Sequence, residues 1–266
     1  MTIKVAIAGA RGRLGSAALK SIMNAPNMEV VAALDYKYEG QYLHVTEVND
    51  VPGGIPIYTS LENLAAVNKP DVLLDVTDPD AVFKNVHDAI SLGIRPVVGT
   101  SGLSKGNIAL LTELAAENQI GGIIAPNFSI GAVLMMKFTA TAARYLGDIE
   151  ILEMHHDKKV DAPSGTAVKT AEMIQAVRES HKQGHSDEKE HLAGARGADF
   201  DGMKIHSIRL PGLLAHQEVL LGGKGELLSI RHDSFDRTSF MPGILMAIHN
   251  VMERQDLVYG LENIID

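Results

Sequence analysis

The fold is decided by a stretch near the start of the chain, residues 3–15, which reads IKVAIAGARGRLG. Its first part, residues 3–8, is a short apolar run typical of a buried strand, and residues 14–25 then carry apolar side chains at helical spacing. A strand, a glycine-rich turn and a helix in direct succession are the context that gives a glycine motif meaning. The stretch therefore predicts the opening βα unit of a nucleotide-binding fold.

Three glycines shape the turn between this strand and this helix. A tight turn needs small residues, and the backbone can approach a pyrophosphate closely only where side chains are missing. Unpaired N–H groups at the start of a helix attract anions, and two arginines in the turn are suited to contact phosphate. We therefore expect a pyridine dinucleotide to be bound by Gly9, Arg11, Gly12, Arg13, Leu14 and Gly15.

An acidic residue, Asp35, ends the next predicted strand, residues 29–34. It follows Gly15 by about 20 residues, the spacing at which a carboxylate accepts hydrogen bonds from the adenosine ribose. Asp35 alone favours NADH, whereas Lys37 would attract the ribose phosphate of NADPH, so both cofactors remain open. The alternative interpretation is a plain βαβ turn with a helix-capping function.

Short apolar runs alternate with helical patterns through the rest of the first half. The predicted strands are 72–76, 96–98 and 122–125, and the predicted helices are 81–92 and 105–118. This alternation predicts an α/β, Rossmann-type, doubly wound parallel sheet. Ligands bind beyond the carboxyl ends of such strands, although turn and cap chemistry is the alternative for these segments. The expected nicotinamide or ribose contacts are Thr77, Gly99, Thr100 and Ser101.

The pattern changes after residue 127 and predicts a second domain. A helix is expected over 131–145 and a strand over 149–155, in which Ile149, Ile151 and, with a slip in the alternation, Met154 share a face. Three further β-type segments separated by glycine turns predict an α+β domain with a mixed or antiparallel sheet. They are 204–209, 217–221 and 226–231.

An apolar helix, residues 240–252, is expected to return to the first domain. The predicted dinucleotide-binding domain is therefore discontinuous, with residues 1–126 rejoined by residues 236–266. The intervening residues, 127–235, form the predicted substrate domain.

Composition excludes several classes of function. The formal charge of -9 gives no basic footprint for nucleic acid or an anionic membrane. The chain has no cysteine, which removes disulfides, thiolate metal sites and thiol nucleophiles. No apolar stretch approaches the roughly 20 residues of a membrane helix, and the start lacks the features of a signal peptide. A cytoplasmic protein is therefore expected. His181 and His185 stand at helical spacing, but we expect a solvated loop there and no metal site.

A second constellation lies in residues 153–166, EMHHDKKVDAPSGT. Ser164 is placed to cap a helix running toward Ser180, so that N–H groups near Gly165 and Thr166 point at a carboxylate. Lys159 adds a full positive charge, and a nearby histidine can donate a proton. The alternative is a strand that ends in surface histidines before a capped helix.

This segment closely resembles the signature of the 4-hydroxy-tetrahydrodipicolinate reductase (dihydrodipicolinate reductase) family, and the resemblance covers essentially the whole chain. The matching segments are residues 9–15, 75–77, 99–102, 125–129, 153–166 and 237–240. The resemblance implies further cofactor contacts from Tyr36, Ala125, Pro126, Asn127, Phe128, Arg237 and Phe240. Some members carry arginine where this chain has Tyr36, which leaves the preference between NADH and NADPH open.

The resemblance also implies a reaction and roles for the residues of the signature. NAD(P)H would transfer a hydride to C4 of a cyclic dicarboxylate, which loses its hydroxyl as water, in lysine and diaminopimelate biosynthesis. His155 would be the general acid, Lys159 would assist protonation or hold substrate charge, and His156 would help bind the substrate. Ser164, Gly165 and Thr166 would bind a carboxylate. The family further implies a homotetramer joined through the second domain.

The residues also bear on two other classes of function. A semialdehyde dehydrogenase needs a cysteine, and no tyrosine here has the lysine four positions later that short-chain reductases use. Another Rossmann dehydrogenase remains an alternative, as does a non-catalytic dinucleotide sensor. A sensor would have no use for His155, Lys159 and the turn at Ser164 together.

Overall fold

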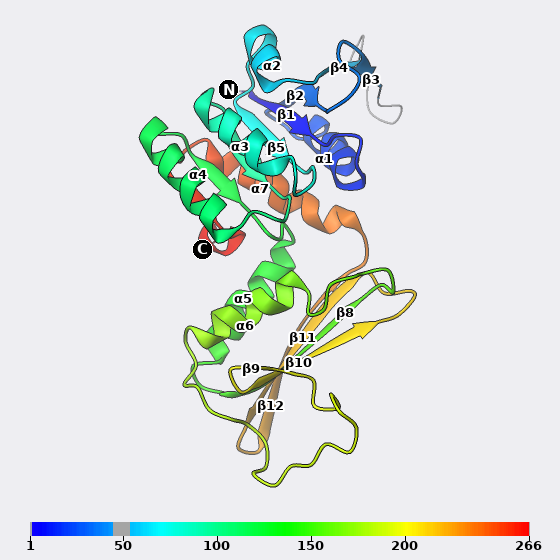
Figure 1. The fold of residues 1–266 in the computed structure, drawn as a ribbon, viewed down its shortest axis with the longest axis vertical. Helices are drawn as coiled ribbons and strands as arrows, with labels where there is room; N and C mark the ends of the chain where they lie inside the picture. Colours follow the sequence, from blue (N-terminus) through cyan, green and yellow to red (C-terminus); the bar gives the residue numbers. More distant parts are fainter. Residues whose placement is uncertain (1, 45–53, 266) are drawn as a thin grey trace. The chain divides into compact units, whose positions relative to one another are not determined.

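The computed structural model describes residues 2–44 and 54–265, which divide into two compact units (Figure 1). Unit 1 comprises Met1–Phe128 and Phe240–Asp266, and unit 2 comprises Ser129–Ser239. The predicted fold class, a Rossmann-type sheet followed by a smaller domain with a mixed sheet, is confirmed.

Unit 1 is built on one sheet whose central strands are mostly buried, with Lys4 and Glu29 as exposed exceptions, as expected when helices cover both faces. In order across the sheet, the strands are β13 (Leu257–Tyr259), β7 (Gly122–Ile124), β6 (Arg95–Val98), β5 (Val72–Asp75), β1 (Ile3–Ala8), β2 (Met28–Leu34), β4 (Ile55–Tyr58) and β3 (Tyr42–Leu43). All neighbouring strands are parallel except β3 and β4. Because β1 lies between β5 and β2, the strand order reverses beside it, and such a switch point is where doubly wound sheets bind ligands.

Among the residues of unit 1 that the structure describes, five helices pack on this sheet. They are α1 (Arg13–Met23), α2 (Leu61–Asn68), α3 (Val82–Ser91), α4 (Lys105–Asn118) and α7 (Met241–Val251). The last helix of the chain, α7, contacts β6, β7 and α1 and so belongs to unit 1. Its start is preceded by a 3-10 turn, Arg237–Phe240.

Unit 2 has a mixed sheet with both of its α-helices on one face (Figure 1). The strands in order are β12 (Glu226–Ser234), β11 (Ala215–Gly223), β8 (Asp148–His155), β10 (Met203–Arg209) and β9 (Ala198–Phe200). β8 and β10 are parallel, and the other pairs are antiparallel. The helices are α5 (Ile130–Ala142) and α6 (Gly165–Gln175), and their apolar faces form a core with alternate residues of the sheet.

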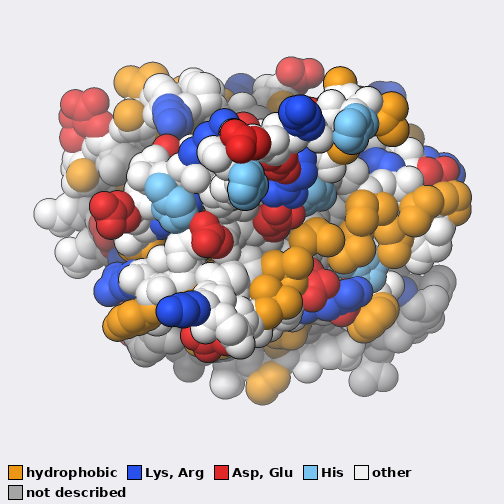
Figure 2. Space-filling view, turned by 90° about the horizontal axis from the view of Figure 1, so that it is seen from below, with side chains coloured by type: hydrophobic (Ala, Val, Ile, Leu, Met, Phe, Trp, Pro, Cys, Tyr) orange, Lys and Arg blue, Asp and Glu red, His pale blue; other side chains and the backbone are white. Residues whose placement is uncertain are grey.

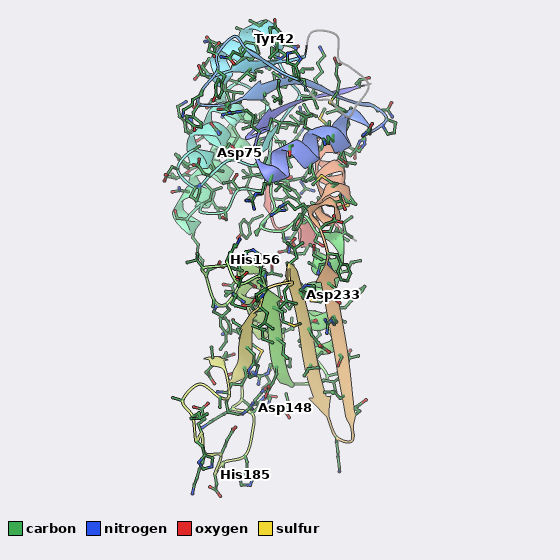
Figure 3. The ribbon with its side chains drawn as sticks, turned by 90° about the vertical axis from the view of Figure 1, so that its right-hand side faces the viewer. Tyr42, Asp75, Asp148, His156, His185 and Asp233 are labelled. Carbon is green, nitrogen blue, oxygen red and sulfur yellow. The ribbon has the colours of Figure 1, made fainter. Side chains whose placement is uncertain are left out.

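In the central strand β8, every second side chain is buried, and this pattern continues past the hydrophobic core to a polar residue. Ile149 and Ile151 are fully buried, and Glu153, on the same face, is buried too. The slip expected at Met154 is wrong: the strand stays regular, and Met154 lies on the other face, opposite His216 of β11. A regular strand can bury the carboxylate at this position because charged partners, described below, surround it. Figure 3 shows Asp148 and His156 near opposite ends of the strand.

Several smaller elements differ from the sequence prediction. β4, α2, β9 and β13 were not predicted, and α6 ends at Gln175 rather than near Ser180. Residues 181–191 are a loop without helix, as expected. In the residues that the structure describes, no helix is both long and apolar enough to cross a membrane.

Candidate active site

The predicted nucleotide turn opens into a pocket of about 770 Å³ in unit 1. Six of the predicted cofactor residues line it: Gly9, Arg11, Gly12, Asp35, Tyr36 and Thr77. Other lining residues were not predicted from the sequence, namely Thr59, Ser60, Leu61, Asp80, Lys84, Asn85 and Asp88. A sequence signal existed for residues 59–61. Ser60 caps α2 and is followed by an apolar helical run, which is the pattern of a helix start.

The glycine turn has the close packing that a dinucleotide cradle requires. Gly9 has a φ of +84°, and a Cβ there would lie 2.6 Å from the carbonyl oxygen of Val76. A Cβ on Gly15 would lie 2.1 Å from the carbonyl oxygen of Gly9. Helix α1 begins after Gly12 with no side-chain cap, so its first turn presents backbone N–H groups. The residues present therefore fit a pyrophosphate at this helix start.

Asp35 is held by Arg11, which belongs to the glycine turn. The guanidinium of Arg11 donates to both carboxylate oxygens, at 2.7 and 3.0 Å, and stacks 4.3 Å from the ring centre of Tyr38. The backbone N–H of Lys37 adds a bond of 3.1 Å, while the Lys37 ammonium lies 4.8 Å from the ring centre of Tyr36. Asp35, expected to bind ribose, and Arg11, expected to bind phosphate, are thus paired with each other.

Asp75, which is labelled in Figure 3, lies at the end of β5. It joins two of the predicted contact segments, residues 75–77 and 99–102. It is fully buried and accepts hydrogen bonds from the hydroxyls of Thr77 and Thr100, at 2.8 and 2.6 Å, and from the amide of Asn85 at 2.8 Å. Because both hydroxyl protons are directed to Asp75, each threonine oxygen can only accept from a further partner. Such acceptors suit ribose hydroxyls or a carboxamide NH₂.

Glu153 is the centre of a charged cluster in unit 2. One carboxylate oxygen lies 2.6 Å from Nδ1 of His155, and the guanidinium of Arg209 donates to both oxygens, at 2.7 and 2.9 Å. The backbone N–H of Ser164 adds a bond of 3.2 Å. Burial alone would raise the pKa of Glu153, but the hydrogen bonds from His155 and Arg209 outweigh it and hold this pKa at about 2. Glu153 is therefore an anion at neutral pH.

The turn after β8 brings Lys159 and the start of α6 to the same strand end. Ser164 is the N-cap of α6, as predicted, and its hydroxyl accepts from the N–H of Ala167 at 3.2 Å. A Cβ on Gly165 would meet nothing within 4 Å, so the helix start is open there. The ammonium of Lys159 donates to both oxygens of Asp161, at 2.7 and 2.9 Å, and this bond holds the pKa of Asp161 below its ordinary value.

The remaining predicted residues lie outside the pocket of unit 1. They are Arg13, Leu14, Gly15, Gly99, Thr100, Ser101, Ala125, Pro126, Asn127, Phe128, Arg237 and Phe240. Gly99 packs against Phe128, since a Cβ on Gly99 would lie 2.5 Å from the Phe128 ring. His156 is half-buried in the turn after β8.

The histidines of the polar loop are engaged separately. His181 bonds the carboxylate of Asp148 at 2.8 Å, which raises the pKa of His181, whereas His185 accepts from the N–H of Asp187. Within residues 2–44 and 54–265, no group of three or more His, Cys, Asp or Glu side chains is arranged to hold a metal ion.

Comparisons with known proteins match the whole chain. A family model described as dihydrodipicolinate reductase, N-terminus, matches residues 3–128, and one described as dihydrodipicolinate reductase, C-terminus, matches residues 131–265. The 4-hydroxy-tetrahydrodipicolinate reductase of Lysinibacillus sphaericus is 54% identical over 265 residues, with 100% of each chain covered. That of Geobacillus kaustophilus is 54% identical over 267 residues, again with 100% of each covered. The solved structure of dipicolinate-bound dihydrodipicolinate reductase from Paenisporosarcina sp. TG-14 is 53% identical, covers 100% of both chains and has a TM-score of 0.89.

Proposed function

The chain belongs to the dihydrodipicolinate reductase family, and we propose how its own residues carry out the reaction of that family. The enzyme is an oxidoreductase of lysine and diaminopimelate biosynthesis that uses NAD(P)H to reduce 4-hydroxy-tetrahydrodipicolinate to tetrahydrodipicolinate. One observation carries the assignment of roles: the imidazole of His155 is oriented by a buried carboxylate beside the start of α6.

Unit 1 binds the dinucleotide in this proposal. The first turn of α1 would hold the pyrophosphate, since Gly9, Gly12 and Gly15 let the backbone approach it. Asp35 would accept from the adenosine ribose, and the acceptor oxygens of Thr77 and Thr100 would bind the other ribose or the carboxamide. Close packing of the glycine turn and the missing side-chain cap on α1 support this part.

Unit 2 binds the substrate. One substrate carboxylate accepts hydrogen bonds at the start of α6 from Ser164, Gly165 and Thr166, where the helix dipole favours an anion. His156 and Lys159 bind the remaining charge. A site with this many donors suits a dicarboxylate, which would otherwise be repelled by the negative charge of the whole protein.

The chemistry requires one hydride and one proton. NAD(P)H, when bound by unit 1, would supply the hydride for C4 of the substrate. His155 donates a proton from Nε2, so that the C4 hydroxyl leaves as water. Lys159 stabilises substrate charge, and the remaining residues contribute by orientation.

We expect both NADH and NADPH to support turnover, with specificity constants that differ by less than about tenfold, or roughly 1.4 kcal/mol. Asp35 can accept from ribose hydroxyls, while Arg11 can leave Asp35 and pair with a ribose phosphate instead. The measurement is steady-state oxidation of each cofactor with the cyclic substrate. A ratio above about a hundredfold would show that one of these charges dominates.

The variant Arg11→Gln separates the two contributions within the same assay. It should weaken NADPH more than NADH, because the added phosphate loses its counter-charge while Asp35 remains. Lys37→Gln is the companion variant, because Lys37 is the other cation expected to attract the ribose phosphate but holds Asp35 only through its backbone.

We also propose a homotetramer that forms through the helix-free face of the unit 2 sheet, together with the cytoplasmic location expected from the sequence. Both helices of unit 2 cover the opposite face, and the helix-free face mixes apolar Leu152 and Leu220 with charged Glu218 and Arg231. Leu227, at the end of β12, is 64% exposed. Figure 2 views the end of unit 2 and shows hydrophobic side chains, in orange, gathered over part of it.

Light scattering tests the assembly. The expected mass is about four times the 28.6 kDa of one chain. Leu220→Lys should reduce it by placing a charge in the buried face, whereas Val67→Lys, at an exposed residue of unit 1, should leave it unchanged. A tetramer that persists unchanged in Leu220→Lys would place the interface elsewhere.

A further inference from the structure

The ring of His155 has one nitrogen committed before any substrate binds. Its Nδ1 lies 2.6 Å from a carboxylate oxygen of Glu153, whose side chain is completely buried. An ionised carboxylate can only accept, so Nδ1 must carry the hydrogen of this bond. The proton that His155 exchanges is therefore the one on Nε2.

Arg209 completes the arrangement from the neighbouring strand. Nη1 and Nη2 of its guanidinium each donate to one oxygen of Glu153, and Nη2 also donates to the carbonyl oxygen of Asp161 at 2.7 Å. In the parallel pairing of β8 and β10, Arg209 lies directly opposite His155. Arg209 thus fixes the carboxylate and ties it to the turn that carries Lys159.

The charges have a chemical consequence for proton transfer. A lone buried carboxylate beside an imidazolium could take its proton and remove the acid. With two guanidinium hydrogen bonds, Glu153 stays ionised and leaves the proton on the ring. The other charged or titratable groups on this strand end and its turn are His156, Asp157, Lys158, Lys159 and Asp161.

We propose that Glu153 and Arg209 are positioning residues of the reaction, which hold His155 in the Nδ1–H tautomer and direct Nε2 to the substrate. This inference rests on the proposed role of His155 as the proton donor. It assigns two residues that touch neither substrate nor cofactor, and it differs from a purely structural ion pair because their effect must pass through the imidazole.

A double-mutant cycle tests this dependence. Glu153→Gln should lower kcat by about tenfold or more in the native background, as loss of an orienting partner does elsewhere. The same change should have little effect on the residual rate of His155→Ala, because the ring through which it acts is gone. An equal loss in both backgrounds would make Glu153 a structural residue and overturn the proposal. Near-normal turnover of His155→Ala would instead refute the proposed proton donor.

The pH profile gives a second readout. A general acid works while protonated, so kcat falls as pH rises through the pKa of the imidazolium. Removing the negative charge of Glu153 leaves Arg209 unopposed, destabilises the imidazolium and moves this loss of activity to lower pH. An unmoved alkaline limb in Glu153→Gln would contradict the inference.

A measurement on the unaltered protein covers the case in which Glu153→Gln does not fold. NMR of isotope-labelled ring nitrogens distinguishes the two neutral tautomers of histidine, and comparison with His155→Ala identifies the signals of His155. We expect the hydrogen on Nδ1. A neutral His155 with its hydrogen on Nε2 would overturn the proposal.

Discussion

Replacing His155 by alanine is expected to lower kcat by about a hundredfold or more, the usual share of rate that a positioned general acid contributes. Departure of a hydroxide from C4 is unfavourable, and protonation by His155 lets it leave as water. The Glu153 carboxylate fixes the ring, so the loss should fall on turnover rather than on substrate binding. The measurement is the steady-state rate of NAD(P)H oxidation with the cyclic substrate.

The adjacent histidine provides a matched comparison for this prediction. His156→Ala removes the same kind of side chain from the next position, but we expect it mainly to raise the KM for substrate. Titration of NAD(P)H fluorescence should give an unchanged Kd in both variants, because all of the predicted cofactor residues except Arg237 belong to unit 1. Near-normal turnover in His155→Ala with intact cofactor binding would shift the role of acid to Lys159 or to an ordered water.

Most of unit 1 was predictable because its signals are local. Largely apolar runs such as residues 3–8 and 72–75 mark buried parallel strands, and the helix over 105–118 was predicted at its observed bounds. The missed elements lack such signals. β4 contains Pro56, which is uncommon inside a strand, and the three residues of β13 are held by pairing with β7. Pairing of distant segments cannot be read from periodicity alone.

The candidate site shows the same division. The glycine turn, Asp35 and the signature around His155 were found because each is contiguous or has a defined spacing. Arg209, the partner of Glu153, was not found, because the two residues meet only through the register of β8 and β10. A carboxylate in an inward-facing position also conflicts with a hydrophobic alternation, and this conflict led to the wrong slip at Met154. An inward charge in a regular strand was the signal that a counter-charge had to exist.

Charges that were considered singly in the sequence proved to be paired in the structure. Arg11 was expected on phosphate and Asp35 on ribose, yet the two hold each other. Lys159 is likewise held by Asp161. Each pair has one exposed member, Arg11 in the first and Asp161 in the second, so an anionic ligand can reach the pair and compete with its carboxylate for the cation. Such a pair keeps a cation in place while the site is empty of substrate.

Replacing Lys159 by alanine is expected to change both KM and kcat, whereas His155→Ala should mainly lower kcat. A fixed cation that holds a carboxylate acts in the ground state and the transition state alike, so its loss raises the substrate KM. Because Lys159 also stabilises charge during the reaction, kcat should fall as well. A hydrogen bond to a charged group contributes about 1.5–3 kcal/mol, which corresponds to roughly a tenfold to hundredfold loss in kcat/KM.

Lys158→Ala is the control for the Lys159 prediction, because it removes an equal charge from the neighbouring exposed position. If only the net charge of the turn mattered, both variants would raise KM to the same extent. A specific contact from Lys159 predicts a large effect at one position and a small one at the other, with the Kd of NAD(P)H unchanged in both. A Lys159→Ala enzyme with reduced kcat but a native KM would mean that this ammonium meets the substrate only in the transition state, and Lys159 would then share the protonation step with His155.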